Sequence, residues 1–339
     1  MKTLILDAPG NSLQMKDAEI PKTVPGFIRV QNKCFGINYG DTLINRIPVF
    51  ARALFRVSKL FGAKTLPGPH PLVFPWVPGF EVAGIVDETS DTSFPVGTRV
   101  IAFPEGGGYA EYVCVPAERV VRIPGDISYD TALGVGLQGI TAYDVLYRTA
   151  NLQRGESVLI SAAAGGVGSL AIQLARLAGA SMVIGATSSA EKMSVIEKLG
   201  ATAINYAQPH WIQQVLDITN ARGVDVALES AGGKQFHEAL KATRDGGRLV
   251  SYGMANIEAG LQKITVMNLK MRGLTLATYK DNWLEHTTQD TWSLLMRLVQ
   301  SNQLTPIIGQ HYSFQATEIN RAWEEYSKRI TYGKSLVFV

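Results

Sequence analysis

Residues 161–180, SAAAGGVGSLAIQLARLAGA, change their hydrophobic period halfway along, and this change limits the fold more than any other stretch of the chain. Just before them, residues 157–160 are a short, largely apolar run of the kind found in buried strands. Beyond the glycines, apolar residues recur at the spacing of one helix face, at Val167, Leu170, Ala171, Leu174 and Ala178. The stretch therefore predicts a strand, a glycine turn and a helix.

The alternation of short apolar runs and helical stretches continues to residue 253. The pattern predicts strands at 157–162, 181–186, 203–206, 224–230 and 248–253. It predicts helices at 167–178, 190–200, 210–220 and 234–243. Strands that alternate with helices in this way form a doubly wound parallel sheet of right-handed βαβ units, so we expect an α/β fold here.

The first 125 residues have a different pattern. Short β-rich runs are separated by Pro and Gly, at 25–34, 77–86, 96–103 and 110–116. This density of turn signals predicts a compact, mainly antiparallel β domain. Two helical stretches, 291–301 and 316–329, precede a last apolar run at 335–339, which we expect to return to the sheet of the first domain. A chain of 339 residues is long enough for two domains.

Composition argues against several classes of protein. The net charge of +3 gives no electrostatic case for a nucleic acid partner. Residues 157–175 carry no charge and are long enough for a membrane span, but their glycines and polar residues favour a strand, turn and helix in water. Two cysteines make no disulfide framework, and the start MKTLILDAPG lacks the apolar core of a signal peptide. We therefore expect a cytoplasmic protein with no integral membrane segment.

The glycine turn matches the dinucleotide-binding pattern GxGxxG with one departure. The three glycine positions fall on Ala163, Gly165 and Gly168, so alanine replaces the first glycine. A strand precedes the turn and a helix follows it, which is the context that the pattern requires. Gly165 and Gly166 let the backbone approach a pyrophosphate, and the helix from Val167 presents its N–H groups there. The alternative is a turn that only packs the helix on the strand.

The end of the second strand indicates which dinucleotide binds. NAD-binding proteins usually carry an acid about 20 residues after the turn, whereas this strand ends in Thr187, Ser188 and Ser189, followed by Lys192. Hydroxyl groups and an ammonium suit a 2′-phosphate, which favours NADPH. The two serines can also cap the next helix, and both roles are compatible. Tyr206, at the end of the third strand, is a candidate to complete the phosphate pocket.

A set of segments carries a family resemblance over nearly the whole chain. They are VPGFEVAGIV (77–86), GGYAEYVCVP (107–116), TAY (141–143), SAAAGGVG (161–168), INY (204–206) and ESAGG (229–233). In this order they resemble the medium-chain dehydrogenases/reductases, and most closely the zinc-independent quinone oxidoreductases with their enoyl reductase relatives. The resemblance implies a GroES-like catalytic domain of residues 1–124 plus 279–339 and an inserted Rossmann domain of residues 125–278. It implies cofactor contacts from Thr141, Ser230 and Gly253 besides the turn residues Gly165, Gly166, Val167 and Gly168.

Two metal-ligand positions of that superfamily carry other residues in this chain. The zinc-dependent members have a cysteine in a GxCHxD-like segment and a histidine in PGHE, and the matching segments here are GINYGD (36–41) and PGFE (78–81). Asn38 and Phe80 take the ligand positions, and an amide with a phenyl ring cannot bind zinc. The cysteine-rich lobe of a structural zinc is absent from residues 103–107, and the five histidines lack ligand spacing. We expect no metal.

Without a metal, the site favours hydride transfer to an acceptor that conjugation already activates. We expect NADPH to reduce a quinone or an α,β-unsaturated carbonyl, with Asn38 and Tyr39 as catalytic contacts to cofactor or substrate. A phenol is a weak acid at neutral pH but a usable hydrogen-bond donor, and both residues have a purely structural alternative. Two other functions stay open: an enoyl-thioester (enoyl-CoA) reductase, and a non-enzymatic NADPH-binding component.

Two segments bear on partners. Residues 49–64 belong to an insertion between Arg46 and Pro78, and they intermix apolar with basic side chains, which predicts an amphipathic helix. It is open whether this helix is a lid, a peripheral membrane contact, a grip for an anionic substrate such as an acyl-CoA, or a helix packed on its own domain. The resemblance also implies a homodimer, joined at the sheet edge by the apolar segment 266–279, whose alternative is an internal strand.

Overall fold

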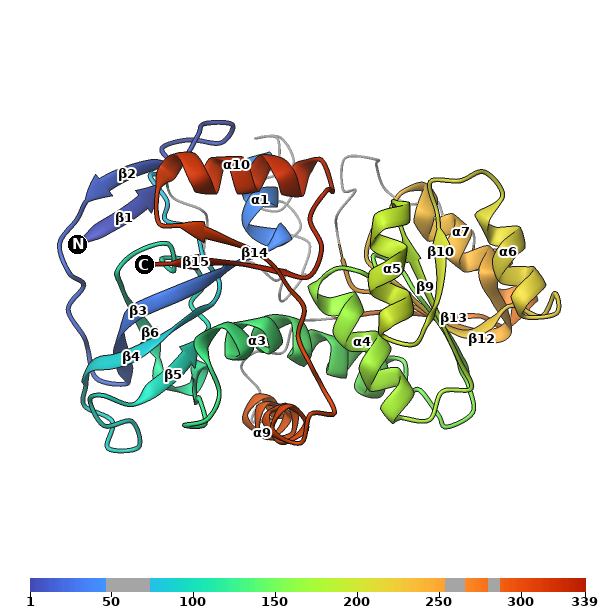
Figure 1. Ribbon diagram of the computed structural model, residues 1–339, viewed down its shortest axis with the longest axis horizontal. Coiled ribbons are helices and arrows are strands. Elements are labelled where there is room, and N and C mark those ends of the chain that lie inside the picture. Colours follow the sequence, from blue (N-terminus) through green and yellow to red (C-terminus); the bar gives the residue numbers. More distant parts are fainter. Residues whose placement is uncertain (47–73, 254–265, 280–286) are drawn as a thin grey trace. The chain divides into compact units, whose positions relative to one another are not determined.

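The computed structural model describes residues 1–46, 74–253, 266–279 and 287–339, which form two compact units (Figure 1). The first unit comprises Met1–Leu137, Asn282–Met296 and Ile308–Val339, and the second comprises Gln138–Asp281 and Arg297–Ile307. Residues 125–137 therefore lie in the first unit, whereas the expected domain boundary is at 124. The assignment of domains to functions stays a prediction.

The second unit is built on a parallel sheet. In the described residues its six strands follow the order β10-β9-β8-β11-β12-β13. Their bounds are β8 Ser157–Ile160, β9 Met182–Thr187, β10 Thr202–Asn205, β11 Val224–Glu229, β12 Thr243–Ser251 and β13 Thr275–Thr278. The order is that of a doubly wound nucleotide-binding fold, so the expected fold class is confirmed.

Helices connect these strands. They are α4 Gly166–Leu177, α5 Ala190–Lys198, α6 Trp211–Ile218, α7 Lys234–Ala242 and α8 Val266–Arg272. Every residue of β8 and of β11 is buried, as expected for parallel strands covered on both faces. Before β8, helix α3 Tyr129–Tyr143 departs from helical geometry at Gly136, and a π-helix follows at Asp144–Thr149.

The first unit is built on a mainly antiparallel sheet. Its path is β14-β15-β3-β4-β5-β7, with β6 paired to β3, and among the described strands of this sheet only β14 and β15 pair in parallel. The strands are β3 Phe27–Ile37, β4 Val82–Thr89, β5 Arg99–Ala102, β6 Tyr112–Pro116, β7 Val120–Arg122, β14 Ile308–Ser313 and β15 Lys334–Phe338. Strand β15 is antiparallel to β3, which confirms the expected return of the chain end to this sheet.

Smaller elements complete the first unit. Strands β1 Lys2–Ile5 and β2 Gln14–Asp17 form a separate pair, and a 3₁₀ turn spans Ala117–Arg119. The helices are α1 Tyr39–Arg46, α9 Thr287–Gln300, which continues into the second unit, and α10 Ala316–Ser327. Tyr326 on α10 donates its hydroxyl to the carbonyl of Ile37 at 3.0 Å. This bond ties α10 to the end of β3, just before the start of α1.

The segment 266–279 is divided in the structure. Val266–Arg272 is helix α8, so the apolar run is not one continuous strand. Thr275–Thr278 forms β13, which pairs with β12 and is the outer strand of the described sheet. The edge position agrees with the expectation for these four residues, while the dimer itself stays a prediction.

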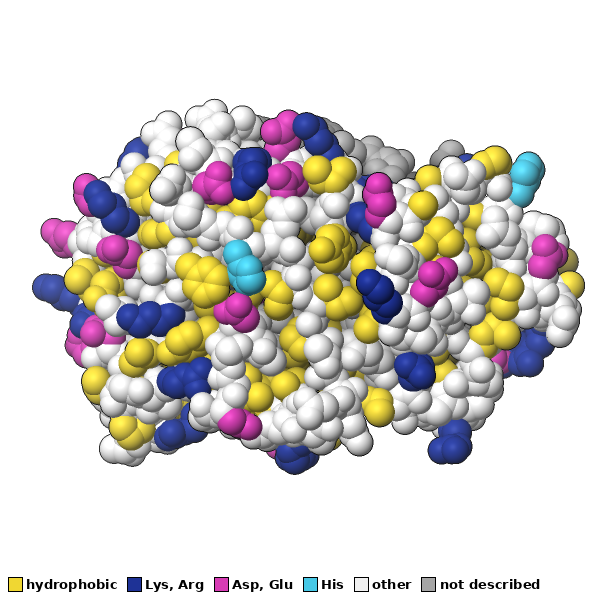
Figure 2. All heavy atoms as spheres, viewed as in Figure 1, with side chains coloured by type: hydrophobic (Ala, Val, Ile, Leu, Met, Phe, Trp, Pro, Cys, Tyr) yellow, Lys and Arg dark blue, Asp and Glu magenta, His cyan; other side chains and the backbone are white. Residues whose placement is uncertain are grey.

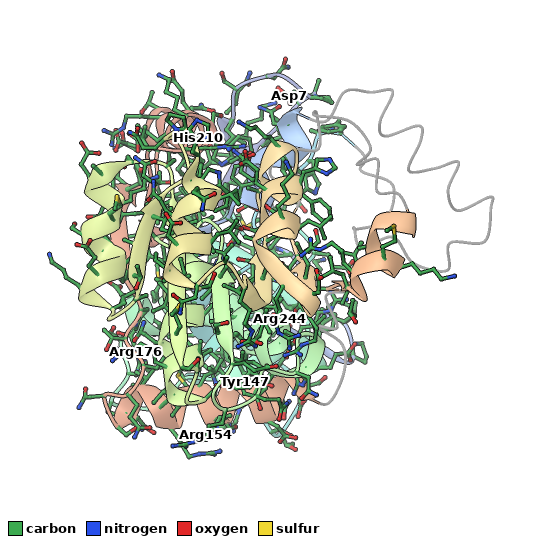
Figure 3. All side chains as sticks on the ribbon, turned by 90° about the vertical axis from the view of Figure 1, so that its right-hand side faces the viewer. Asp7, Tyr147, Arg154, Arg176, His210 and Arg244 are labelled. Carbon is green, nitrogen blue, oxygen red and sulfur yellow. The ribbon has the colours of Figure 1, made fainter. Side chains whose placement is uncertain are left out.

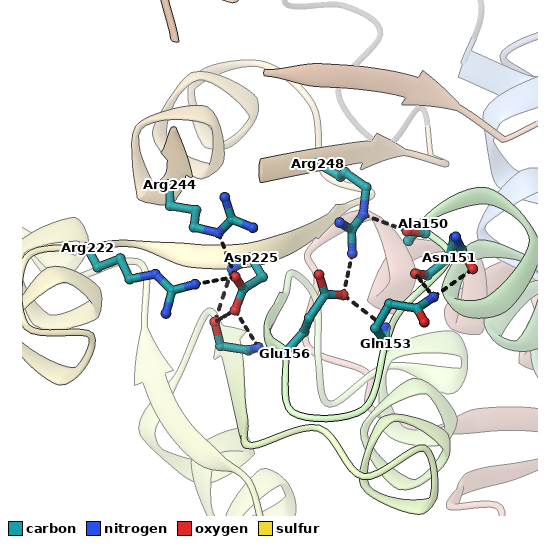
Figure 4. Close-up of polar contacts among 9 residues, drawn as sticks. Ala150, Asn151, Gln153, Glu156, Arg222, Asp225, Arg244 and Arg248 are labelled. Carbon is teal, nitrogen blue, oxygen red and sulfur yellow. Dashed lines mark hydrogen bonds and ion pairs between the residues drawn. The ribbon is translucent and has the colours of Figure 1, made fainter. Parts of the chain in front are cut away.

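The amino ends of the parallel strands are held by ion pairs (Figure 4). Asp225 accepts hydrogen bonds from the N–H and the hydroxyl of Ser157 at 2.8 and 2.7 Å and pairs with Arg222 and Arg244. Burial alone would raise the pKa of Asp225, but the bonds from Ser157 and the two guanidinium groups lower it to about 2. The buried carboxylate of Asp225 is therefore balanced by two guanidinium groups at this end of the sheet.

The surface carries no large patch of one sign on the face drawn in Figure 2, where acidic and basic side chains are interspersed. This agrees with the low net charge of the chain. Among the described residues, no helix is long and apolar enough to cross a membrane.

Candidate functional site

The carboxyl ends of the parallel strands gather most of the predicted cofactor residues. In Figure 3, His210, which follows β10, lies at one end of the second unit, and Arg154 and Arg176 lie at the other. The glycine turn follows β8, and Thr187, Tyr206, Ser230 and Gly253 end or follow the neighbouring strands. In open α/β sheets this edge is where ligands bind.

The glycine turn leads directly into helix α4. Gly165 is the N-cap of α4, and its N–H donates to the carbonyl of Ala162 at 2.9 Å. The first turn of α4 holds no acid, and its N-cap Gly165 has no side chain to form a cap bond, so the helix dipole favours an anion there. Gly165, Gly166 and Val167 are partly exposed, whereas Gly168 is buried. The turn therefore offers its first residues as a backbone cradle.

Gly168 is required by close packing. A Cβ at this position would lie 2.6 Å from the Ala162 carbonyl oxygen and 2.6 Å from Ala163 Cα. Both atoms belong to the backbone and cannot swing away. Gly168 thus performs the role of the third glycine in the pattern, which lets the helix approach its strand.

The alanine at the first glycine position is accommodated by the neighbouring strand. Ala163 is fully buried, and its N–H donates to the carbonyl of Ala186 on β9 at 3.0 Å. A Cβ on Gly185 would lie 2.9 Å from the Cβ of Ala163 and 2.6 Å from Ile196. Gly185 on β9 therefore makes the room that the missing glycine would have provided.

The polar residues at the end of β9 come together with the end of β10. Thr187 is buried, and its carbonyl accepts the N–H of Tyr206 at 2.9 Å. Ser188 and Ser189 are partly exposed, and Lys192 lies in the first turn of α5. Ser189 is the N-cap of α5, but its side chain makes no cap bond and donates to Glu191 at 3.4 Å.

Glu191 is an acid that the expected pocket did not include. It lies in the first turn of α5, is exposed, and is next to Lys192 in the chain. A carboxylate favours a helix N-terminus, which gives Glu191 a structural reason to be there. The sequence already offered this signal, because Glu191 falls in the first turn of the helix predicted at 190–200.

Strand ends β8, β11 and β12 meet at a serine pair. The N–H of Ser230 donates to the hydroxyl oxygen of Ser161 at 2.8 Å, and the two hydroxyl oxygens are 3.4 Å apart. A Cβ on Gly253 would collide with the Ser230 carbonyl, so glycine permits this approach. The buried Glu229 carboxylate accepts the N–H groups of Ala231 and Gly232 at 2.7 and 3.0 Å and shapes the turn. Ser161 was not among the predicted residues.

Thr141 lies in the second unit, on the last turns of α3. One helical turn earlier, Gln138 packs against the glycine turn, because a Cβ on Gly166 would lie 2.7 Å from Gln138 Cγ. The structure thus places the helix that carries Thr141 next to the turn.

In the first unit, Asn38 and Tyr39 mark the start of helix α1. Asn38 is buried and Tyr39 is partly exposed. The N–H of Asn38 donates to the carboxyl of Asp41 at 2.8 Å, while the N–H of Asp41 donates to the carbonyl of Asn38 at 3.1 Å. The two residues thus bond to each other in both directions, as in a capping box, and these bonds fix the start of α1.

The side chain of Asn38 contacts a buried ion pair. Lys334, the first residue of β15, donates from Nζ to Asn38 Oδ1 at 2.7 Å and pairs with Glu81. The Lys334 side chain is 2% exposed and that of Glu81 is 0% exposed. Neither residue was predicted as part of a site, and Lys334 is separated from Asn38 by 296 positions in the chain.

A zinc ion does not fit the two substituted ligand positions. Phe80 packs its ring at a centroid distance of 6.2 Å from Trp76, and its Cε2 lies 4.0 Å from where a Gly40 Cβ would be. The Asn38 oxygen already accepts from an ammonium group, whose positive charge would repel a cation beside it. No group of three metal-ligating side chains occurs in the described part of the chain.

Asp41 is expected to make stability depend on pH. Complete burial raises the pKa of Asp41 to about 7, although Asn38 and Tyr109 donate to it and Lys334 is nearby; Glu81 adds to the rise. Its Oδ1 accepts no hydrogen bond from the described residues, which suits a protonated carboxyl.

The protonated form is favoured by folding, so the contribution of Asp41 is fully present below its ordinary pKa and is lost as the pH rises through about 7. We expect the free energy of unfolding of the wild type, followed by urea titration, to fall more between pH 5 and pH 8 than that of Asp41→Asn. Equal slopes in the two proteins would contradict this assignment.

The predictions that concern partners of the basic segment 49–64 are not tested by the site described above. The basic segment 49–64 lies outside the described residues, so its proposed roles stay predictions.

Comparisons with known proteins identify the family. The alcohol dehydrogenase GroES-like domain family matches residues 24–125, and the family described as zinc-binding dehydrogenase matches residues 166–301. A probable quinone oxidoreductase of Schizosaccharomyces pombe is 31% identical over 97% of this chain and 94% of its own length. A 2-haloacrylate reductase of a Burkholderia species is 34% identical over 79% of this chain and 77% of its own length.

A solved structure agrees with these relatives. The Escherichia coli quinone oxidoreductase complexed with NADPH superposes with a TM-score of 0.84 at 26% identity, covering 100% of both chains. The matched families, the relatives and the shared fold lead to one assignment. The chain belongs to the medium-chain dehydrogenase/reductase superfamily, in its quinone oxidoreductase-like branch.

Proposed function

We propose that this protein is an NADPH-dependent, metal-independent oxidoreductase that transfers hydride to a quinone or to a conjugated carbonyl compound. The observation that carries the proposal is a combination of two features in one chain. The second unit has the glycine turn at the end of β8, and the first unit has Asn38 and Phe80 at the positions of the metal ligands. When bound, NADPH would supply the hydride. The solved relative complexed with NADPH supports this choice of cofactor.

The residues of the second unit suit the phosphates of a dinucleotide. The N–H groups at the start of α4 and the closely packed Gly168 form the pyrophosphate cradle. Thr187, Ser188, Ser189 and Tyr206 are proposed to bind the adenosine ribose and its 2′-phosphate. Ser230 and Gly253 line the strand ends that follow, and Thr141 is carried over from the family resemblance.

Lys192 is proposed to bind the 2′-phosphate of NADPH through its ammonium group. Lys192→Ala should weaken NADPH binding by about 1.5–3 kcal/mol, because a hydrogen bond to a charged group is lost, and should leave NADH binding almost unchanged. The matched control is Glu191→Ala, which removes the neighbouring opposite charge and should leave NADPH binding equal or tighter. Calorimetric titration with both cofactors measures this, and equal losses for NADPH and NADH would contradict the assignment.

The Asn38 amide is proposed to contact the acceptor, and Tyr39 to assist it. A conjugated acceptor develops negative charge on an oxygen remote from the carbon that receives hydride, and a hydrogen-bond donor stabilises that charge without a metal. The 2-haloacrylate reductase among the relatives supports a conjugated acceptor, since an acrylate carries a carbon–carbon double bond next to a carbonyl group.

An acceptor panel tests the proposal against its alternatives. Purified, chelator-dialysed protein would be assayed for NADPH oxidation with simple quinones, enals and enoyl-CoA thioesters. Turnover with quinones or enals supports the proposal, and clear preference for enoyl-CoA would support the enoyl-thioester reductase. Tight NADPH binding without turnover on any acceptor would favour the non-enzymatic component. A small-molecule acceptor, a homodimer and a cytoplasmic location remain parts of this proposal.

A further inference from the structure

The Lys334–Glu81 pair is built into the first unit at some cost. Taking two charges out of water is unfavourable, so a buried pair needs close geometry and further hydrogen bonds. Glu81 contacts Lys334 through Oε1 and accepts the N–H of Leu137 through Oε2 at 3.2 Å. Each carboxylate oxygen therefore has a partner, and the pair is held from two sides.

Two glycines make the space that the pair occupies. A Cβ on Gly36 would lie 2.5 Å from Lys334 Cε and 2.6 Å from Glu81 Oε1. A Cβ on Gly136 would lie 3.0 Å from Glu81 Oε2. Gly36 is the first residue of the GINYGD segment and lies on β3, so the strand that ends just before Asn38 is shaped around the pair.

The ammonium of Lys334 determines how the Asn38 amide is oriented. Lys334 has only donors, so the Asn38 atom that it contacts at 2.7 Å must be the oxygen. The oxygen and the NH₂ group are attached to the same planar carbon, so an oxygen held by Lys334 directs the NH₂ group to a different side. Asp41 holds the main chain of the same residue. Asn38 is thus fixed through both its backbone and its amide oxygen.

We propose that Lys334, held in place by Glu81, is a positioning residue that fixes the Asn38 amide as a hydrogen-bond donor toward the substrate carbonyl. This inference rests on the proposed function, because it takes Asn38 as the contact to the acceptor. The Lys334 side chain is only 2% exposed, so in this proposal it acts on the substrate through Asn38 and not by direct contact. Its positive charge on the amide oxygen also polarises the NH₂ group, which strengthens the bond that the NH₂ group donates.

A double-mutant cycle on turnover tests this coupling. Lys334→Met, Asn38→Ala and the combined variant would be assayed with NADPH and a simple quinone, and kcat and KM for the quinone separated. We expect Lys334→Met to lower kcat by about tenfold to a hundredfold in the Asn38 background, because a misplaced contact loses the productive geometry. In the Asn38→Ala background the same replacement should change kcat by less than about twofold.

Two further variants keep the test decisive. If Lys334→Met alone folds poorly, Lys334→Met with Glu81→Gln removes both charges together and enters the same cycle. Lys328→Met breaks an exposed pair with Glu324 on α10 and serves as the matched lysine control, expected to leave kcat unchanged.

The outcomes separate this inference from the proposed function. If the wild type fails to oxidise NADPH with every quinone and conjugated carbonyl compound tested, the proposed function fails and the inference fails with it. If the wild type is active but Lys334→Met lowers kcat equally in both backgrounds, Lys334 does not act through Asn38, and only the inference is overturned. A wild-type kcat in Asn38→Ala would overturn the inference and remove Asn38 from the site.

Discussion

Lys334→Met is expected to lower the free energy of unfolding by about 3–5 kcal/mol, because it leaves the Glu81 carboxylate buried without its partner. The pair is almost completely buried, so solvent cannot screen the remaining charge. Urea unfolding at neutral pH, followed by tryptophan fluorescence and by circular dichroism, measures the loss.

Replacing both members should recover most of that loss. Lys334→Met with Glu81→Gln buries no unpaired charge, and the glutamine oxygen can still accept the N–H of Leu137. The exposed pair Lys328–Glu324 is the control, where Lys328→Met should cost less than about 1 kcal/mol. If the Lys334→Met protein is as stable as the Lys328→Met protein, the buried Lys334–Glu81 pair does not stabilise the fold as an ion pair.

Gly168→Ala is expected to destabilise the protein by about 1–3 kcal/mol and to reduce NADPH affinity, because the new methyl group would meet backbone atoms of the turn. Either the helix start or the turn must shift, and both belong to the proposed pyrophosphate cradle. The matched control is Gly125→Ala, where a Cβ would meet no atom within 4 Å.

Thermal unfolding and NADPH titration of the two alanine variants measure both effects. If Gly168→Ala binds NADPH as tightly as Gly125→Ala does, the turn does not form the cradle, and the packing alternative for the glycines becomes the better account.

The second unit could be predicted well from sequence, since its signals are local. Helix α4 shows its apolar face every three to four residues, and the strands beside it are continuous apolar runs. Parallel strands then bring their carboxyl ends to one edge by geometry alone, which places Thr187, Tyr206 and Ser230 there without further information. The secondary structure of segment 266–279 was harder to predict from sequence, because its apolar residues fit a helix and a strand equally well.

The first unit held the residues that sequence reasoning missed. Lys334 and Glu81 are 253 positions apart and meet only because β15 pairs with β3 and β3 pairs with β4. A lysine is normally exposed, so nothing local indicates a buried one. The substituted segments GINYGD and PGFE contain Asn38 and Glu81, but nothing in them indicates the cation that lies between the two side chains.

The most direct measurement of the central claim uses NADPH carrying deuterium on one or the other face of C4. Chelator-dialysed protein would be given each cofactor with a simple quinone and with a conjugated enone. The account predicts a primary isotope effect from one face only, deuterium on the β-carbon of the reduced enone, a proton from water on the α-carbon, and the same rate with or without chelator. Absence of NADPH oxidation with both acceptors, or activity that returns only when zinc is added, would contradict it.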